Sequence, residues 1–316
     1  MIETFLQNLP HGITLSCRAA GVPGRPVLMF LHGFPEGAFV WDALLEHFAL
    51  PANGGYRCVA PNLRGFERSS APVEASAYRP KYLVQDIAAL IALQTQAKDG
   101  RAGGAPLACL IAHDWGGAVA WNLANQRPEL ASRLAIINSP HPGSFWRELK
   151  NNPQQQAASA YMNFLIRPDA EQLLAQDDFR RMWRFLTAGV AGSQQPPWLT
   201  EDVKAQYRDL WSRGLTGGCN YYRASPLRPA RKDDPGVATI DLPRSMLTID
   251  LPTLLIWGVK DVALLPELVD GLEDYVKHLT VKKVVDASHW IVHEQPQRVI
   301  ALLNDFLRQP ARASVQ

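Results

Sequence analysis

The chain has 316 residues, of which 47% are hydrophobic and 20% are charged, and this composition excludes a disordered, collagen-like or coiled-coil protein. Its 32 Lys and Arg and 30 Asp and Glu leave a net charge of +2, so electrostatic binding to nucleic acid or to an anionic membrane is not expected. The length suits one large domain or a domain that carries an insertion.

The sequence offers little evidence of targeting or of a metal. Residues 1–10 lack a basic segment followed by an apolar one, so no secretory signal is expected, and apolar runs such as 107–112 are too short to span a bilayer. The four cysteines lie far apart, with no Cys-x-x-Cys pair, so no zinc site is expected. We therefore predict a cytoplasmic protein without a cofactor, and the sequence does not indicate its oligomeric state.

The first part of the chain predicts a sheet. Residues 5–9 and 13–17 flank Pro10-His11-Gly12, which suggests an antiparallel hairpin at one edge. Helix-like apolar spacing at 84–93 and 117–125 separates short apolar runs, which are typical of parallel strands covered on both faces. The predicted strands are 27–31, 58–60, 107–112, 134–137, 253–257 and 281–285. The pattern predicts an α/β fold with a mostly parallel sheet and an antiparallel N-terminal edge.

The alternation of strands and helices is interrupted between the fourth and fifth of these strands. The interrupting stretch is rich in Trp, Gln, Arg and Tyr and contains helix-like segments such as 172–186 and 203–211. We therefore predict that 141–235 is a helical insertion in a core formed by 1–140 and 236–316.

The most informative segment follows the third predicted strand. There Ala112-His113-Asp114-Trp115-Gly116 has the small-x-nucleophile-x-small spacing of a nucleophile elbow, with Asp where a serine usually stands. Small residues are needed on both sides because the turn leaves no room for larger side chains. The alternative is that Asp114 only caps the helix that begins here.

Three further residues follow other predicted strands. Asp261 comes after the strand at 253–257, and His289 comes after the strand at 281–285. In open parallel sheets the carboxyl ends of the strands form the ligand site, and the chain order of nucleophile, acid and histidine suits a catalytic triad. Phe34 follows the strand at 27–31, where its N–H could join that of Trp115 in an oxyanion hole; the alternative is an ordinary turn.

Four motifs carry a resemblance to a known family. They are His-Gly-Phe-Pro-Glu at 32–36, Arg-Gly-Phe at 64–66, His-Asp-Trp-Gly-Gly at 113–117 and Asn-Tyr-Tyr-Arg at 220–223. Together they resemble the α/β-hydrolase superfamily and, within it, the epoxide hydrolases, over nearly the whole chain. The resemblance implies an α/β-hydrolase fold in which the insertion is a helical cap domain.

The resemblance also implies the roles of individual residues. It makes Asp114 the nucleophile, His289 the base and Asp261 the acid that orients the base. Phe34 and Trp115 become the two donors of the oxyanion hole.

Tyr222 matches the family's cap tyrosine that hydrogen-bonds the epoxide oxygen. A second cap tyrosine usually stands four residues before a proline; that count reaches Phe164, and Tyr161, one helical turn away, is the candidate substitute. Tyr161 and Phe164 are candidate substrate contacts, as are Tyr221 and Glu36. Adjacent residues on a helix point about 100° apart, so only one of Tyr221 and Tyr222 is expected to face the pocket. Glu36 could orient water or the base, or lie at the surface.

An aspartate nucleophile indicates a particular chemistry. A carboxylate with a pKa near ~4 is ionised at neutral pH, and it can displace a leaving group from saturated carbon to give an alkyl ester. His289 would then activate water to hydrolyse that ester. We therefore predict hydrolysis at sp³ carbon, which disfavours an esterase.

The leaving group distinguishes two candidate enzymes. An opened epoxide needs an acid such as Tyr222, whereas haloalkane dehalogenases generally have Asn at the position of Phe34. Fluoroacetate dehalogenases carry arginine at the positions of Trp115 and Ala118. Conversion of a small-molecule epoxide to a vicinal diol is therefore favoured over dehalogenation of an organohalide, and a non-catalytic ligand-binding protein of the same fold is the third alternative.

Overall fold

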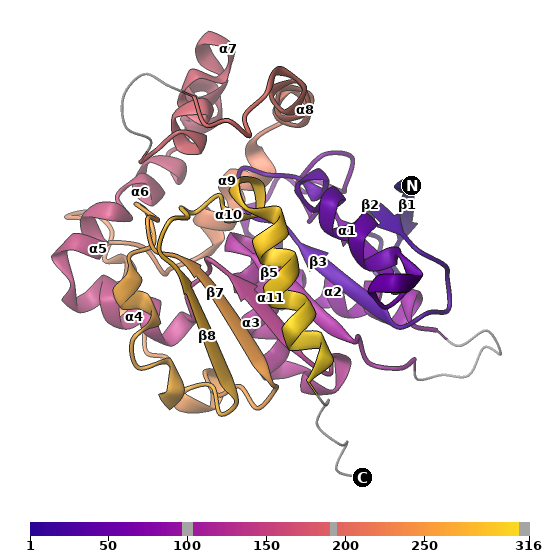
Figure 1. Ribbon diagram of the computed structural model, residues 1–316. Helices are drawn as coiled ribbons and strands as arrows, with labels where there is room; N and C mark the ends of the chain where they lie inside the picture. Colours follow the sequence, from indigo (N-terminus) through magenta and orange to yellow (C-terminus); the bar gives the residue numbers. More distant parts are fainter. Residues whose placement is uncertain (97–103, 190–194, 310–316) are drawn as a thin grey trace.

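The protein is described from a computed structural model, which covers residues 1–96, 104–189 and 195–309. In these ranges eight strands form one sheet in the order β1-β2-β4-β3-β5-β6-β7-β8 (Figure 1). β1 pairs with β2, and β2 with β4, in antiparallel register, and the remaining pairs are parallel. The strands are β1 (Glu3–Asn8), β2 (Thr14–Ala20), β3 (Val27–Leu31), β4 (Arg57–Pro61), β5 (Cys109–His113), β6 (Leu134–Ile137), β7 (Thr253–Gly258) and β8 (Leu279–Val284). The predicted α/β fold with an antiparallel N-terminal edge is confirmed.

Helices cover both faces of the sheet. The flanking helices are α1 (Asp42–Ala49), α2 (Pro80–Gln94), α3 (Asp114–Gln126) and α11 (Pro296–Arg308). In β3, Leu28 and Phe30 pack in one core cluster with α1 and α11, whereas Met29 and Leu31 pack in the other with α2 and α3. Alternate side chains of a strand point to opposite faces, so the near-continuous apolar runs of the central strands follow from burial on both sides.

Two strand predictions need correction. β5 begins at Cys109 rather than at Leu107, which forms a separate bridge to Ala131. β8 begins and ends earlier than predicted, and Lys282, Lys283 and Val285 are exposed. The expectation that this last strand is buried on both faces is wrong, because β8 lies at the edge of the sheet, where one side and part of one face meet solvent.

Among the residues that the structure describes, six α-helices lie between β6 and β7. They are α4 (Pro142–Asn151), α5 (Pro153–Ala158), α6 (Tyr161–Leu165), α7 (Ala170–Leu186), α8 (Glu201–Ser212) and α9 (Thr216–Ala224). α7 and α8 stand clear of the sheet at the top of Figure 1. α7 is kinked at its middle, where Asp177, Asp178 and Phe179 have positive φ angles of 54°, 51° and 59°. The helix-like patterns predicted at 172–186 and 203–211 therefore form helices, one of them interrupted.

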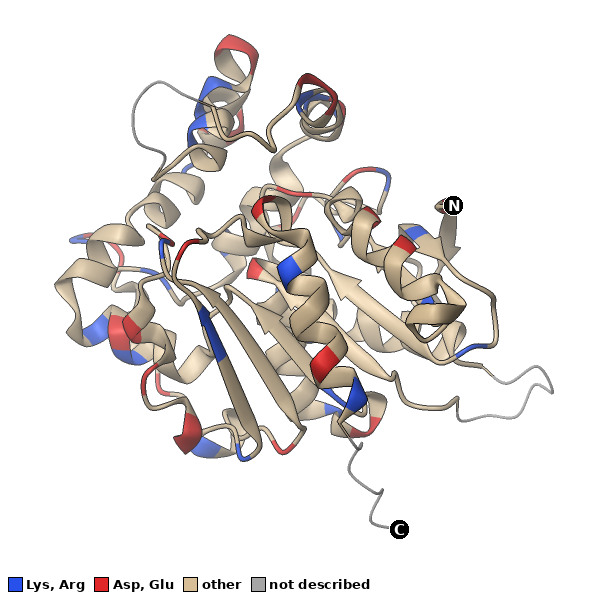
Figure 2. Ribbon diagram, in the orientation of Figure 1, with Lys and Arg blue, Asp and Glu red and all other residues tan. Residues whose placement is uncertain are grey.

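Charged residues of both signs are intermixed along the ribbon (Figure 2). Across the described ranges, every helix is too short or too polar to cross a membrane. All four cysteines are buried and are not paired with one another, as is common for free cysteines in a protein core.

Candidate active site

Asp114 lies on a tight turn between β5 and α3. Its φ of 48° is in the left-handed region, which a non-glycine residue adopts only where the surroundings enforce it. A Cβ atom at Gly116 would come within 2.4 Å of the Leu31 carbonyl oxygen, and one at Gly33 would come within 2.3 Å of Asp114 Cβ. The turn therefore requires glycine at these two places. The N-cap of α3 is His113, so the interpretation of Asp114 as a helix cap is wrong.

The Asp114 carboxylate faces the two predicted backbone donors. The N–H of Phe34 donates to Asp114 Oδ1 at 2.7 Å, and the N–H of Trp115 also hydrogen-bonds the carboxylate. Burial raises the pKa of Asp114 above its usual value, although the positive potential of His289 and both N–H groups oppose the rise. One carboxylate oxygen thus already occupies a site built for a negatively charged oxygen.

His289 lies between two carboxylates. Its Nδ1 is 2.6 Å from Asp261 Oδ2, and its Nε2 is 3.8 Å from Asp114 Oδ2. Burial would lower the pKa of His289, but the charge and hydrogen bond of Asp261, with the charges of Asp114 and Glu36, raise it to about 9. The structure therefore brings together the three residues predicted as a triad.

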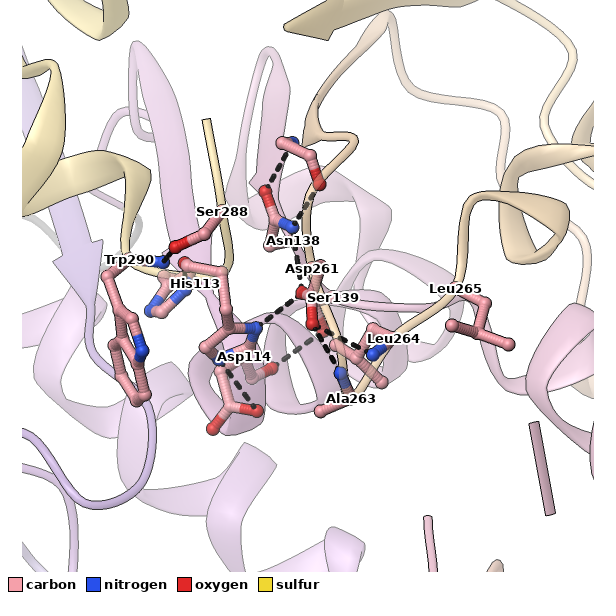
Figure 3. A network of polar contacts seen from close by, with 12 residues as sticks. His113, Asp114, Asn138, Ser139, Asp261, Ala263, Leu264, Leu265, Ser288 and Trp290 are labelled. Carbon is pink, nitrogen blue, oxygen red and sulfur yellow. Dashed lines mark hydrogen bonds and ion pairs between the residues drawn. The ribbon is translucent and has the colours of Figure 1, made fainter. Parts of the chain in front are cut away.

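Three neutral donors hold Asp261 in addition to His289 (Figure 3). Its Oδ1 accepts the N–H groups of Ala263 and Leu264, both at 2.9 Å, and its Oδ2 accepts the Asn138 amide at 2.9 Å. Burial alone would raise the pKa of Asp261, yet His289 and these donors lower it below its usual value. The carboxylate is thus kept ionised beside the imidazole without a lysine or arginine partner.

Sequence reasoning missed Asn138 and Ser139. Asn138 Oδ1 accepts the N–H of Gly258 at 2.8 Å, and Ser139 Oγ donates to the Asp114 carbonyl oxygen at 2.6 Å. Both residues directly follow β6. The rule that polar residues at the carboxyl ends of parallel strands meet at one site pointed to them as it did to Asp261.

Aromatic side chains from two inserted helices face the nucleophile. The ring centroid of Tyr222, on α9, lies 5.1 Å from that of Trp115 and 5.3 Å from that of Phe34. It lies 6.0 Å from the ring centroid of Tyr161, on α6. The Tyr161 and Tyr222 hydroxyls hydrogen-bond one another. Burial, followed by the negative charge of Asp114 among other groups, raises the pKa of both phenols, so each stays protonated as a potential acid.

The structure also places Tyr221 and the two alternative residues of α6, Tyr161 and Phe164. The Tyr221 hydroxyl donates to the Arg64 carbonyl oxygen at 3.0 Å, so it is committed to the loop after β4 rather than to the pocket. Tyr161, and not Phe164, is the α6 residue whose ring packs against Tyr222.

Glu36 is fully buried, so its interpretation as a surface residue is wrong. Its Oε2 lies 2.9 Å from His113 Nδ1. Burial would raise the pKa of Glu36, but His113 and His293 together hold it well below its usual value. Glu36 is therefore an ionised carboxylate next to the site.

The surroundings of Phe34 are apolar. A small pocket beside it is lined by Pro35, Phe66, Met182, Leu210, Trp211 and Leu215. In the described ranges the structure has no group of three or more His, Cys, Asp or Glu residues that could hold a metal ion. The titratable side chains that meet at this site are those of Asp114, Asp261, His289, Tyr161 and Tyr222.

Known proteins resemble the chain over most of its length. Residues 26–296 match the family described as alpha/beta hydrolase fold. The AB hydrolase superfamily protein YfhM of Bacillus subtilis is 33% identical over 94% of this chain and 96% of its own. Epoxide hydrolase 3 of Xenopus tropicalis is 32% identical over 96% of this chain and 77% of its own.

Solved structures show the same likeness. An epoxide hydrolase from Bacillus megaterium, determined with an inhibitor, superposes with a TM-score of 0.82 and 29% identity over 96% of this chain and 100% of that chain. An epoxide hydrolase from metagenomes of hot environments gives a TM-score of 0.80 and 31% identity over 98% of this chain and 100% of that chain.

Proposed function

The chain belongs to the α/β-hydrolase fold family and to its epoxide hydrolase-like group, and from this premise we propose that it opens an epoxide to a vicinal diol. The observation that carries the proposal is the placement of Asp114: the N–H groups of Phe34 and Trp115 hydrogen-bond its carboxylate, His289 faces Oδ2, and the hydrogen-bonded pair of Tyr161 and Tyr222 lies nearby. The substrate is a small-molecule epoxide.

The first step is alkylation of the enzyme. Asp114 Oδ2 attacks one carbon of the epoxide, a C–O bond of the ring breaks, and its electron pair goes to the epoxide oxygen. That oxygen takes the proton of Tyr222 or Tyr161, because an alkoxide leaving group is stabilised by a positioned acid. The result is an alkyl ester on Asp114.

The second step is hydrolysis of this ester. His289 Nε2 takes a proton from water, and the water oxygen attacks Asp114 Cγ. The negative charge that develops on Oδ1 is stabilised by the N–H groups of Phe34 and Trp115, each worth roughly 3 kcal/mol of barrier. The tetrahedral species collapses as the bond from Asp114 Cγ to Oδ2 breaks. The diol leaves with the former Oδ2, which takes the proton from His289, while the water oxygen stays on the enzyme.

Electrostatics couple the two steps. Before alkylation the two neighbouring aspartates, with Glu36, raise the pKa of His289 to about 9 although burial opposes the rise, so the imidazole is protonated at neutral pH. Ester formation removes the charge of Asp114, and the pKa of His289 falls. The imidazolium can then pass its proton to the tyrosinate that alkylation left behind, and the neutral imidazole accepts a proton from water.

The division of the chain supports this mechanism. We assign residues 141–235 to a cap and 1–140 with 236–316 to the core. The candidate acids Tyr161 and Tyr222 then come from the cap, whereas the triad comes from the core. The reaction would take place between the two parts.

The alternatives have less support. A dehalogenase would use the same nucleophile, but a departing halide needs no acid like the tyrosine pair, and no observation favours it. A non-catalytic ligand-binding protein has no need for a base held by an ionised Asp261.

A single-turnover experiment in ¹⁸O-labelled water tests the proposal. Excess enzyme is mixed with a styrene-type epoxide, and the peptide that contains Asp114 is analysed by mass spectrometry. One heavy oxygen should appear in Asp114 and none in the diol of the first turnover. Label in the first diol would mean that water attacks the epoxide directly, and the ester mechanism would be wrong.

A further inference from the structure

Glu36 is held by side chains that the proposed mechanism does not use. Its Oε2 is 2.9 Å from His113 Nδ1, and its Oε1 is 3.3 Å from His293 Nε2 and 3.4 Å from the Tyr207 hydroxyl. That hydroxyl is 2.8 Å from His293 Nε2. Tyr207 is fully buried and the side chain of His293 is 10% exposed, so these contacts are shielded from water and correspondingly strong.

The contacts of both ring nitrogens of His113 fix the orientation of its ring. Its Nε2 faces the backbone carbonyl oxygen of His289 at 2.9 Å, which can only accept, so Nε2 carries a proton. Its Nδ1 faces the ionised carboxylate of Glu36, which also accepts. His113 therefore bridges the two groups: its Nε2 donates to the His289 carbonyl oxygen, and its Nδ1 lies within hydrogen-bond distance of the Glu36 carboxylate, so Glu36 fixes the ring that holds the backbone of His289.

Helix α8 reaches the Glu36 loop at two points one turn apart. Tyr207 contacts Glu36, and Trp211 Nε1 donates to the Pro35 carbonyl oxygen at 2.8 Å. Residues four apart lie on the same face of a helix, so this face of α8 is directed at the loop that also carries Phe34. The Trp211 contact holds the loop even when the Tyr207 hydroxyl is absent.

From this geometry we propose that Tyr207 and His293 are positioning residues for ester hydrolysis. They hold Glu36 against His113, and His113 holds the backbone of His289. The inference rests on the proposed function, because it concerns the second step of that mechanism. Alkylation should be spared, since the Asp114 carboxylate is fixed by Phe34 and Trp115 rather than by Glu36.

Rapid-quench kinetics of Tyr207→Phe measure the two steps separately. The variant keeps the ring and its packing and loses only the hydroxyl. Ester hydrolysis should slow about tenfold, the effect of one hydrogen bond to a charged group, while the rate of alkylation stays the same. Tyr78→Phe is the matched control, because Tyr78 is also buried and its hydroxyl bonds the Pro72 carbonyl oxygen outside this network; it should hydrolyse the ester at the wild-type rate.

A double-mutant cycle separates positioning from packing. If Tyr207 acts through Glu36, Tyr207→Phe should slow hydrolysis little further when Glu36→Gln is already present, because coupled residues are not additive. His293→Gln retains an N–H donor and should keep most of the hydrolysis rate, whereas His293→Leu should lose about as much as Tyr207→Phe.

Two results would overturn the inference. One is a wild-type rate of ester hydrolysis in Tyr207→Phe, and the other is full additivity with Glu36→Gln. Absence of any ester on Asp114 in the wild-type enzyme would instead remove the proposed function. The two failures are therefore distinguishable in one set of quench experiments.

Discussion

Two buried carboxylates near His289, Asp261 and Glu36, are held in different ways. Asp261 touches the imidazole directly and is satisfied by two backbone N–H groups and the Asn138 amide. Glu36 reaches His289 only through His113 and is surrounded by groups that can gain or lose protons.

The difference shows how one fold can separate two tasks. Three donors that do not titrate support the charge of Asp261 beside the imidazole, which suits a group that must stabilise an imidazolium. A carboxylate held by side chains from several elements, one of them Tyr207 of α8, can transmit the position of that helix to the site. Asp261 should therefore matter for the chemistry itself, and Glu36 for the alignment of the base.

The largest effect is expected for Asp261→Asn. The amide keeps the shape of the side chain but removes its charge and favours the wrong tautomer of His289, so ester hydrolysis should slow by about 10⁴-fold. Rapid-quench measurement should show ester accumulating on Asp114. If Glu36→Gln impaired hydrolysis as strongly as Asp261→Asn, the contrast drawn between the two carboxylates would be wrong.

A smaller effect is expected for the acids of the first step. Tyr222→Phe should slow alkylation by about 10²-fold for epoxides, because it removes a positioned proton donor. The same change should affect an alkyl halide far less, since a halide needs no proton. Equal slowing of both substrates would contradict the acid role and would favour a packing role for the tyrosine.

Asn138→Ala tests the support of Asp261. It removes one hydrogen bond to the carboxylate and leaves the Gly258 N–H without its partner. Loss of a bond to a charged group should slow hydrolysis about tenfold, well short of Asp261→Asn. Steady-state kcat at saturating epoxide measures the effect, with circular dichroism to check the fold; an unchanged kcat would mean that the two backbone donors alone hold Asp261.

Unfolding at several pH values tests how much the charge of Glu36 contributes to stability. The pKa of Glu36 is lowered in the fold, so its contribution to stability is present above its unfolded pKa and is lost as the pH falls through the folded value. Glu36→Gln should therefore be less stable than the wild type at pH 7, and the difference should shrink in acid below the unfolded value. Urea unfolding at several pH values measures this; a difference that does not depend on pH would mean that the charge of Glu36 contributes nothing.

The smallest effect is expected for Tyr221→Phe. Its hydroxyl bonds the Arg64 carbonyl oxygen, so the change should lower the free energy of unfolding by about 1 kcal/mol and leave both chemical steps unchanged. Thermal unfolding and rapid-quench kinetics check the two halves of this expectation. A large decrease in the rate of alkylation would indicate instead that Tyr221 contacts the substrate.

The parts of the fold that depend on residues close together in the chain could be predicted from the sequence. The strand periodicity and the spacing around Asp114 are visible because neighbouring residues in the chain carry them. The edge position of β8 could not be predicted in this way, because an apolar run does not reveal which strand lacks a neighbour. The same limit applies to the site. Asp261 and His289 could be predicted because each follows a strand. The contact of Tyr207 with Glu36 joins residues 171 positions apart, so it becomes visible only when α8 is placed in the structure.

Trapping the ester in a His289→Gln variant tests the central claim most directly. This variant keeps the nucleophile but lacks the base, so one equivalent of epoxide should remain attached, and the intact mass should rise by the mass of the substrate. Peptide mapping should place the adduct on Asp114. An unmodified protein after the epoxide has been converted to diol, or an adduct on any other residue, would contradict an aspartyl ester as the intermediate.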